Sequence, residues 1–230
     1  MSHSKTKYIL TDIEGTTTSI SFVADELFPY FRKNIHVLKS LKDTETVKQA
    51  FEETILLSQE LENKRISTED EIIDTLYRWS MEDKKYTPLK AVQGILWENG
   101  YKSGELKGHI YPEMKDQLEK WSKQNLQLGV FSSGSVAAQK LIFGYSVSGD
   151  LTPYFSNYFD TKTGTKRDIQ TYSKIAEILS LNPNEILFLS DIYEELEAAD
   201  QAGFQTVQLV REPVEKQWRK QVNSFEEIFE

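Results

Sequence analysis

Five short apolar runs, each followed by polar turn residues and then by a helical pattern, constrain the fold of this chain most strongly. They span residues 8–13, 126–131, 158–159, 186–189 and 206–210. Short apolar runs are typical of strands buried on both faces of a parallel sheet. Since parallel strands that alternate with helices connect by right-handed crossovers, the sequence predicts an α/β fold. We expect a Rossmann-like, doubly wound parallel sheet with helices on both faces.

The first two runs are separated by about a hundred residues, far more than a crossover between parallel strands needs. Within this insertion, apolar residues recur at helical spacing in four blocks, at residues 28–38, 47–55, 72–79 and 89–96. Four amphipathic helices of this kind form a small bundle. We therefore expect a core domain of residues 1–22 and 105–230 and a four-helix domain of residues 23–104. Gly100, Gly104 and Gly108 favour a hinge where the chain returns to the core.

The composition narrows the class of protein. The 230 residues include 27 Lys and Arg against 36 Asp and Glu, and the net charge of −9 disfavours binding to nucleic acid or to anionic membranes. The absence of cysteine excludes disulfides, a thiolate nucleophile and Cys-ligated zinc. No segment approaches the ~18 consecutive apolar residues of a membrane span. We expect a soluble, cytoplasmic monomer, present also in the nucleus if the source is a eukaryote.

Polar residues follow the apolar runs at the points where the predicted strands end. In chain order they are Asp12 and Glu14, then Ser132 and Ser133, then Lys166, then Asp191. Ligands of open parallel sheets bind beyond the carboxyl ends of the strands, and neighbouring strands lie only about 4.8 Å apart. These side chains are therefore expected to converge on one small volume.

The chemistry of these residues indicates phosphoryl transfer. Asp12, Glu14 and Asp191 form the set of hard oxygen donors that Mg²⁺ prefers. Lys166, the two serine hydroxyls and the free N–H groups at the start of the following helix form a site for a phosphate. A carboxylate beside a metal and a phosphate can attack phosphorus and form an acyl phosphate, which water then hydrolyses.

Taken together, these segments resemble the four motifs of the haloacid dehalogenase (HAD) superfamily of aspartyl phosphatases. The motifs are residues 12–16, Ser132, Lys166, and Ser190-Asp191 with an acidic residue, Glu195, four positions after Asp191. The helical insertion after the first motif resembles the cap domain of that superfamily. The likeness is closer still to the enolase-phosphatases of methionine salvage, through residues 11–17, 20–23, 27–30, 104–108, 132–136, 138–140, 149–151, 159–161 and 188–191. Glu14, where most of the superfamily has Asp, agrees with this family, whereas residues 212–214 depart from its Pro-Gly-Asn.

This resemblance implies roles for the acidic residues. Asp12 would be the nucleophile and a ligand of one Mg²⁺ ion per chain. Glu14 would be a second ligand, through its side chain or its carbonyl, and a candidate general acid. Asp191 would be the third protein ligand, and Glu195 either supports the site or only stabilises the N-terminus of its helix.

The resemblance also implies the substrate. Ser132 and Ser133 would bind its phosphate, and Lys166 would hold both the phosphate and the Asp12 carboxylate. The family's substrate is a small phosphorylated diketone, 2,3-diketo-5-methylthiopentyl 1-phosphate. It is first enolised and then dephosphorylated to the acireductone 1,2-dihydroxy-3-keto-5-methylthiopentene. The base for enolisation is left open between Glu14 and a residue of the cap domain.

Two other functions compete with this one. The first is a capped phosphatase of the same superfamily that acts on a sugar phosphate or an amino-acid phosphate. The second is a catalytically silent scaffold that binds partners through its cap domain. All four motifs are intact, which argues against the scaffold.

Overall fold

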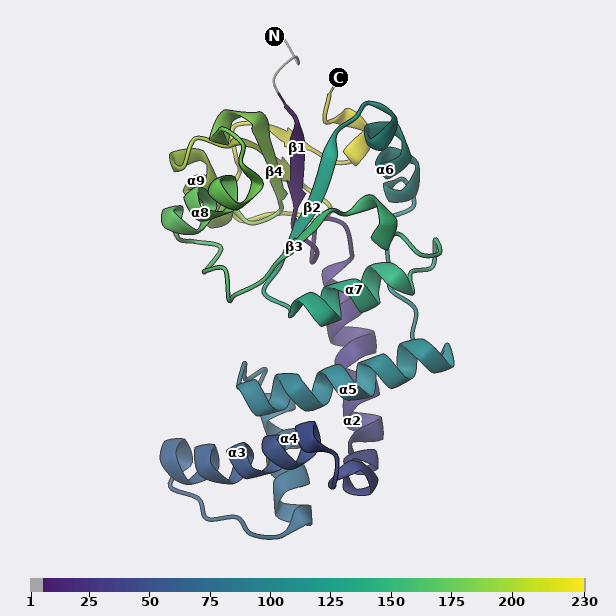
Figure 1. Cartoon of the computed structure of the whole chain (residues 1–230), viewed down its shortest axis with the longest axis vertical. Helices are drawn as coiled ribbons and strands as arrows, with labels where there is room; N and C mark the ends of the chain where they lie inside the picture. Colours follow the sequence, from purple (N-terminus) through teal and green to yellow (C-terminus); the bar gives the residue numbers. More distant parts are fainter. Residues whose placement is uncertain (1–5, 230) are drawn as a thin grey trace. The chain divides into compact units, whose positions relative to one another are not determined.

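The structure is a computed structural model that describes residues 6–229. Within them, six strands form one parallel sheet in the order β3-β2-β1-β4-β5-β6 (Figure 1). The strands are β1 (Tyr8–Thr11), β2 (Gln127–Phe131), β3 (Asn157–Phe159), β4 (Ile186–Ser190), β5 (Gln205–Leu209) and β6 (Gln221–Val222). The first five correspond to the five apolar runs. β6 was not predicted, because Gln221 is polar and exposed and Val222 alone does not form an apolar run.

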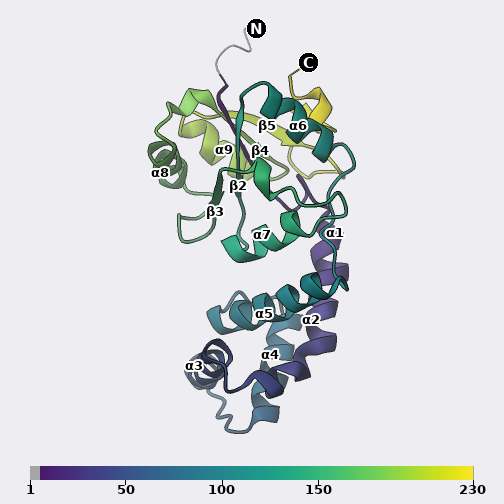
Figure 2. The same cartoon turned by 45° about the vertical axis from the view of Figure 1, so that its right-hand side comes forward.

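Helices cover both faces of this sheet (Figures 1 and 2). Helices α8 (Ile169–Leu179) and α9 (Tyr193–Gln201) lie on one face, and α6 (Met114–Lys123) and α7 (Val136–Gly144) lie on the other. Successive strand residues point to opposite faces, so Tyr8 and Leu10 share a buried cluster with Tyr172 of α8, whereas Ile9 points the other way. The predicted doubly wound α/β fold is confirmed.

The chain divides into two compact units. The first contains the sheet, with the residues up to Ile20 and those from Lys107 onward, and the second is Ser21–Leu106. The sequence analysis placed these boundaries after residues 22 and 104, two residues away on each side.

The second unit is helical and has its own core. Short α1 (Ile20–Phe22) leads into a π-helical turn (Val23–Leu27), α2 (Phe28–Asn34) and a 3₁₀ segment (Ile35–Leu41). The longer helices are α3 (Glu45–Glu62), α4 (Glu69–Met81) and α5 (Thr87–Ser103). Their buried apolar residues, among them Phe31, Leu76 and Trp79, form one continuous cluster. At the start of α4, Thr68 and Glu71 form a capping box, which satisfies N–H groups that the helix itself leaves free.

The glycines expected to form a hinge have other roles. Gly100 lies inside α5, where a Cβ atom would come within 2.6 Å of the Tyr30 ring. Gly104 ends α5 in the left-handed conformation, with φ of +81°. Gly108 is bonded through its backbone to Tyr145 and Val147. The hinge interpretation is therefore wrong at Gly100, whose lack of a side chain allows close packing within a helix.

Hydrogen bonds join the two segments of the first unit that flank the insertion. The N–H of Tyr111 donates to the carbonyl of Thr17 at 3.1 Å, and the Thr18 hydroxyl donates to the carbonyl of His109 at 2.8 Å. The N–H of Ser19 donates to Nδ1 of His109 at 3.1 Å. The chain therefore leaves the first unit and returns to it along one bonded pair of segments.

No helix within residues 6–229 combines the length and the apolar character needed to cross a membrane.

Candidate active site

Asp12 lies at the carboxyl end of central strand β1, at the start of a tight loop. The N–H groups of Thr17 and Thr18 both donate to the carbonyl of Ile13 at 2.9 Å, and the N–H of Gly15 donates to the carbonyl of Thr18 at 2.7 Å. Because these bonds curl the loop back on itself, Asp12 is fixed at the strand end with its side chain buried.

Gly15 brings this loop against Asp191, which follows β4. Its φ of +75° lies in the left-handed region that favours glycine, and a Cβ atom here would lie only 2.3 Å from Oδ2 of Asp191. The strand register reinforces this proximity, because Thr11 pairs with Leu189 and Asp12 and Asp191 follow one and two residues later. Glycine is therefore required at position 15 for both conformation and space.

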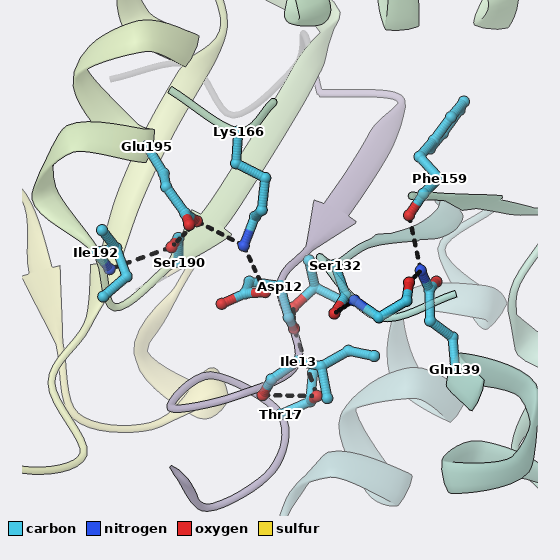
Figure 3. Close-up of polar contacts among 12 residues, drawn as sticks. Asp12, Ile13, Thr17, Ser132, Gln139, Phe159, Lys166, Ser190, Ile192 and Glu195 are labelled. Atoms are coloured by element: carbon cyan, nitrogen blue, oxygen red, sulfur yellow. Dashed lines mark hydrogen bonds and ion pairs between the residues drawn. The ribbon is translucent and has the colours of Figure 1, made fainter. Parts of the chain in front are cut away.

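A buried ammonium group joins Asp12 to a second carboxylate (Figure 3). Nζ of Lys166 lies 2.6 Å from Oδ1 of Asp12 and 2.6 Å from Oε2 of Glu195. The Lys166 and Asp12 side chains are each 7% exposed, and Glu195 is 12% exposed. The hydroxyl of Ser190 donates to the same Glu195 oxygen at 2.8 Å. Lys166 thus brings together three parts of the chain, which are the end of β1, the turn before α8 and the first turn of α9.

The electrostatics of the site depend on this single positive charge. Burial alone would lower the pKa of the Lys166 ammonium, but its contacts with Asp12 and Glu195 raise that pKa above its ordinary value. Burial, with the charge of Asp12 next in size, raises the pKa of Asp191 to about 7. Burial and Asp12 also raise the pKa of Glu195. One ammonium therefore faces three carboxyl groups, and negative charge is in excess.

A divalent cation fits this excess charge. Oδ1 of Asp191 is buried without a hydrogen-bond partner among the described residues, and an unpaired buried carboxylate oxygen is unfavourable unless a cation or a donor reaches it. The side chain of Glu14 is exposed, and residues 6–229 hold no cluster of three His, Asp or Glu side chains arranged around a metal position. The structure thus brings Asp12 and Asp191 together.

The serines lie at the end of the neighbouring strand, β2. Thr11 pairs with Val130, so Asp12 and Ser132 follow adjacent strand ends. Ser132 is buried, and its hydroxyl accepts a hydrogen bond from the N–H of Gly134 at 3.1 Å, whereas Ser133 is exposed. Ser135 caps α7 by accepting from the N–H of Ala138. The expected phosphate site therefore consists of a fixed Ser132 and an accessible Ser133 just before a helix N-terminus.

Two residues support the site and were not assigned such a role from sequence. The side-chain amide of Gln139 on α7 donates to the carbonyls of Gly134 and Phe159, at 2.8 Å each, and so fixes the Ser132 loop (Figure 3). The hydroxyl of Tyr172 on α8 donates to the carbonyl of Lys166 at 2.7 Å. Gln139 lies within residues 138–140, which carry the family resemblance, but a glutamine or tyrosine on a helix does not by itself indicate which distant loop it contacts.

Comparison with known proteins identifies the family of this chain. The model of a family described as haloacid dehalogenase-like hydrolase matches residues 6–203. The enolase-phosphatase E1 of a Picosynechococcus species is 51% identical over 208 residues, which cover 89% of this chain and 90% of that protein. That of Pseudomonas fluorescens is 47% identical over 224 residues, 95% of each chain.

Solved structures show the same fold. The UTR4 protein of Saccharomyces cerevisiae is 31% identical, with a TM-score of 0.79, over 97% of this chain and 100% of that one. CbbY from Rhodobacter sphaeroides, solved in complex with phosphate, is 16% identical with a TM-score of 0.58 and supports the fold alone. The resemblance drawn from the motifs is confirmed: this chain belongs to the haloacid dehalogenase-like hydrolases and, within them, to the enolase-phosphatase E1 family.

Proposed function

We propose that this protein is the bifunctional enolase-phosphatase of methionine salvage. It converts 2,3-diketo-5-methylthiopentyl 1-phosphate to 1,2-dihydroxy-3-keto-5-methylthiopentene and phosphate. The observation that carries this proposal is the buried Asp12 carboxylate, 2.6 Å from the Lys166 ammonium and next to an unpaired oxygen of Asp191. This arrangement suits a nucleophile that works beside a cation.

In the phosphatase step, a carboxylate oxygen of Asp12 attacks phosphorus, and the bond between phosphorus and the ester oxygen on C1 breaks. The departing oxygen takes a proton, for which Glu14 is the candidate general acid. Water then hydrolyses the aspartyl phosphate, which restores the Asp12 carboxylate and releases phosphate. Lys166 holds Asp12 in place and offsets charge on the transferring oxygens.

We assign the cofactor as one Mg²⁺ ion per chain, held by Asp12, Asp191 and the carbonyl or carboxylate of Glu14. Bound there, the ion would offset phosphoryl charge and polarise the adjacent dicarbonyl. Mg²⁺ commonly keeps several water ligands, so a small number of protein oxygens is sufficient.

Ser132 and Ser133 bind the substrate phosphate in this proposal, together with Lys166. The Ser132 hydroxyl is oriented by the N–H of Gly134, and the exposed Ser133 can adjust to the ligand. The N–H groups at the start of α7 add further donors.

In enolisation a base removes a proton from C1, next to the C2 carbonyl, and the C2 oxygen gains a proton, which leaves an enol phosphate. The base is either Glu14 or a residue of Ser21–Leu106, the helical unit that we propose acts as the cap and limits the access of bulk water to the reaction. The partner of this protein is thus a small phosphorylated molecule, and we propose that the protein acts as a cytoplasmic monomer.

The test supplies the diketone phosphate with and without Mg²⁺ and follows both the ultraviolet absorbance of the enol product and phosphate release. We expect both signals with the ion and neither without it, and no phosphate release from Asp12→Asn. Fast release from sugar or amino-acid phosphates without an enol signal would favour the other capped phosphatase. A normal rate in Asp12→Asn would end the nucleophile assignment, and an inactive wild type would favour the scaffold.

A further inference from the structure

Arg211 lies two residues after β5, and the mechanism above gives it no role. Its side chain is only 9% exposed, and arginine is seldom buried to this extent without partners. The guanidinium lies over two aromatic rings, 4.1 Å from the centre of Tyr111 and 4.9 Å from that of Phe225. Such stacking is favourable because the positive charge faces the π-electrons of the rings.

The same guanidinium has three polar partners. Nη2 lies 2.6 Å from Oε1 of Glu113, and Nη1 donates to the carbonyl of Asn223 at 2.8 Å. Nε donates to the carbonyl of Thr16 at 3.4 Å. A planar guanidinium can serve three partners at once because its five N–H groups form a rigid fork, which an ammonium group lacks. Arg211 thus joins three segments that are distant in sequence.

Two of these segments belong to a firmly packed part of the sheet-bearing unit. Glu113 directly precedes α6, and the side-chain amide of Gln117 on α6 donates to the carbonyl of Phe225 at 2.9 Å. The Trp121 ring on α6 contacts the Phe225 ring edge-on, with the ring centres 5.7 Å apart. Helix α6 and the C-terminal segment lie side by side in both views (Figures 1 and 2). Arg211 is therefore supported from this side.

The third segment is the loop after β1, which carries candidate site residues. Thr16 follows Glu14 and Gly15, and Gly15 lies against the Asp191 carboxylate. The contact of Arg211 is thus made one residue after the glycine that brings the loop to Asp191. A shift of the Thr16 carbonyl would move this part of the loop.

Tyr111 supports the loop at the next residue. Its N–H donates to the carbonyl of Thr17 at 3.1 Å, and its ring lies under the guanidinium. Two consecutive carbonyls of the loop, those of Thr16 and Thr17, are therefore held by Arg211 and by the residue that it stacks on.

We propose that Arg211 is a positioning residue for the reaction. Its guanidinium holds the loop after β1 in the conformation that places Gly15 against Asp191, and so sets the geometry of the metal site. The effect on the reaction rests on the proposed function, whereas the effect on the loop does not. The alternative is that Arg211 only stabilises the packing of the C-terminal segment.

Two variants separate these roles. Arg211→Lys keeps the positive charge but loses the fork. The double variant Arg211→Met with Glu113→Gln keeps side chains of similar size and leaves no buried charge unpaired, so its stability should be close to that of the wild type. Arg219→Lys is the matched control, because Arg219 also stacks on a ring, that of Trp218, and pairs with Asp200, but is 63% exposed.

Hydrogen exchange of the metal-free protein, resolved by residue, measures the loop directly. In both Arg211 variants the N–H groups of Gly15, Thr17 and Thr18 should exchange about tenfold faster than in the wild type, while Leu10 in β1 stays slow. Magnesium affinity by calorimetry and kcat for phosphate release should each fall by about 10- to 100-fold. Arg219→Lys should behave as the wild type in all three measurements.

Wild-type exchange of the loop in either folded Arg211 variant would overturn the inference, as would faster exchange combined with wild-type magnesium affinity. Melting curves identify any loss of fold. If neither variant folds, Arg211 serves to hold the unit together, and the inference is overturned as well. Failure of the proposed function has a different signature, which is the absence of enol and phosphate signals from the wild type. In that case loop exchange in the metal-free protein still decides whether Arg211 holds the loop.

Discussion

Lys166 contacts two carboxylates at once, and only one of them, Asp12, is the candidate nucleophile. The other, Glu195, shares one oxygen between Lys166 and the hydroxyl of Ser190. Since Glu195 holds the ammonium that also contacts Asp12, we propose that Glu195 acts on the reaction through Lys166.

Glu195→Gln should lower kcat by about 10- to 100-fold, the usual effect of removing a residue that orients a catalytic group. The physical reason is that an amide keeps the shape of the side chain but loses the charge that holds Lys166. The measurement is steady-state phosphate release with a thermal melt. Glu197→Gln, an exposed carboxylate on the same helix, is the matched control and should behave as the wild type. A wild-type kcat in Glu195→Gln would show that Glu195 only stabilises its helix.

Asp191 predicts a pH dependence of metal binding. Its raised pKa of about 7, caused first by burial and then by Asp12, means that a proton occupies the carboxyl below neutral pH and must leave before a cation binds. Magnesium affinity should therefore be about tenfold weaker at pH 6 than at pH 8. Calorimetry at the two pH values provides the check. Asp191→Asn is the variant that has no titratable group at this position. Equal affinities in the wild type at pH 6 and pH 8 would contradict the prediction.

Single site residues could be predicted from sequence where a polar residue directly follows the end of a strand. Asp12, Ser132 and Asp191 could be found in this way, because the apolar run before each of them marks where a buried strand stops. Glu195 was left between two roles, since a carboxylate in the first turn of a helix is favourable without any partner. The contacts of Glu195 with Lys166 and with the Ser190 hydroxyl, which depend on the tertiary fold, support the role in the site.

At the scale of elements, the Asp191 side chain limits the space available to the loop after β1. Gly15→Ala would force a Cβ atom toward the Asp191 carboxylate and would also strain a backbone with positive φ, which costs about 1–2 kcal/mol. We expect weaker magnesium binding together with a lower melting temperature.

Gly104→Ala is the matched control for that substitution. Gly104 has a similar φ of +81°, but no atom lies within 4 Å of the position that its Cβ would take. It should lower the melting temperature by a similar amount and leave magnesium binding at the wild-type level. If both variants bind magnesium as the wild type does, the contact between Gly15 and Asp191 has no part in the metal site.

Most of the elements that were predicted correctly have a long or largely buried apolar pattern. The four helical blocks of the insertion and strands β1, β2, β4 and β5 have it, whereas β3 has three residues, of which only Phe159 is buried. Strand β6 does not have it, because its place depends on where the chain returns after β5 rather than on local periodicity. The hinge prediction failed at Gly100 for a related reason. The sequence alone does not distinguish a glycine that allows close helix packing from one that allows backbone flexibility.

On the scale of the whole molecule, each unit has its own buried core. Leu76 is fully buried in the core of the helical unit, so Leu76→Ala should destabilise that unit by about 2–5 kcal/mol. Because the sheet has a separate core, hydrogen exchange should accelerate within residues 21–106 and stay slow in β1 and β4. Leu56→Ala, at a position that is 66% exposed, is the control. Equal acceleration in both units would mean that they unfold as one.

The bonded pair of segments beside the insertion has a consequence for how such a protein can diversify. Hydrogen bonds join Thr17, Thr18 and Ser19 to His109 and Tyr111. The two points where the chain passes between the units are therefore held together within the sheet-bearing unit. Replacement of residues 21–106 by another helical domain should therefore leave these hydrogen bonds intact. The strand ends that carry Asp12, Ser132 and Asp191 would then stay unchanged while the inserted domain varies among related proteins.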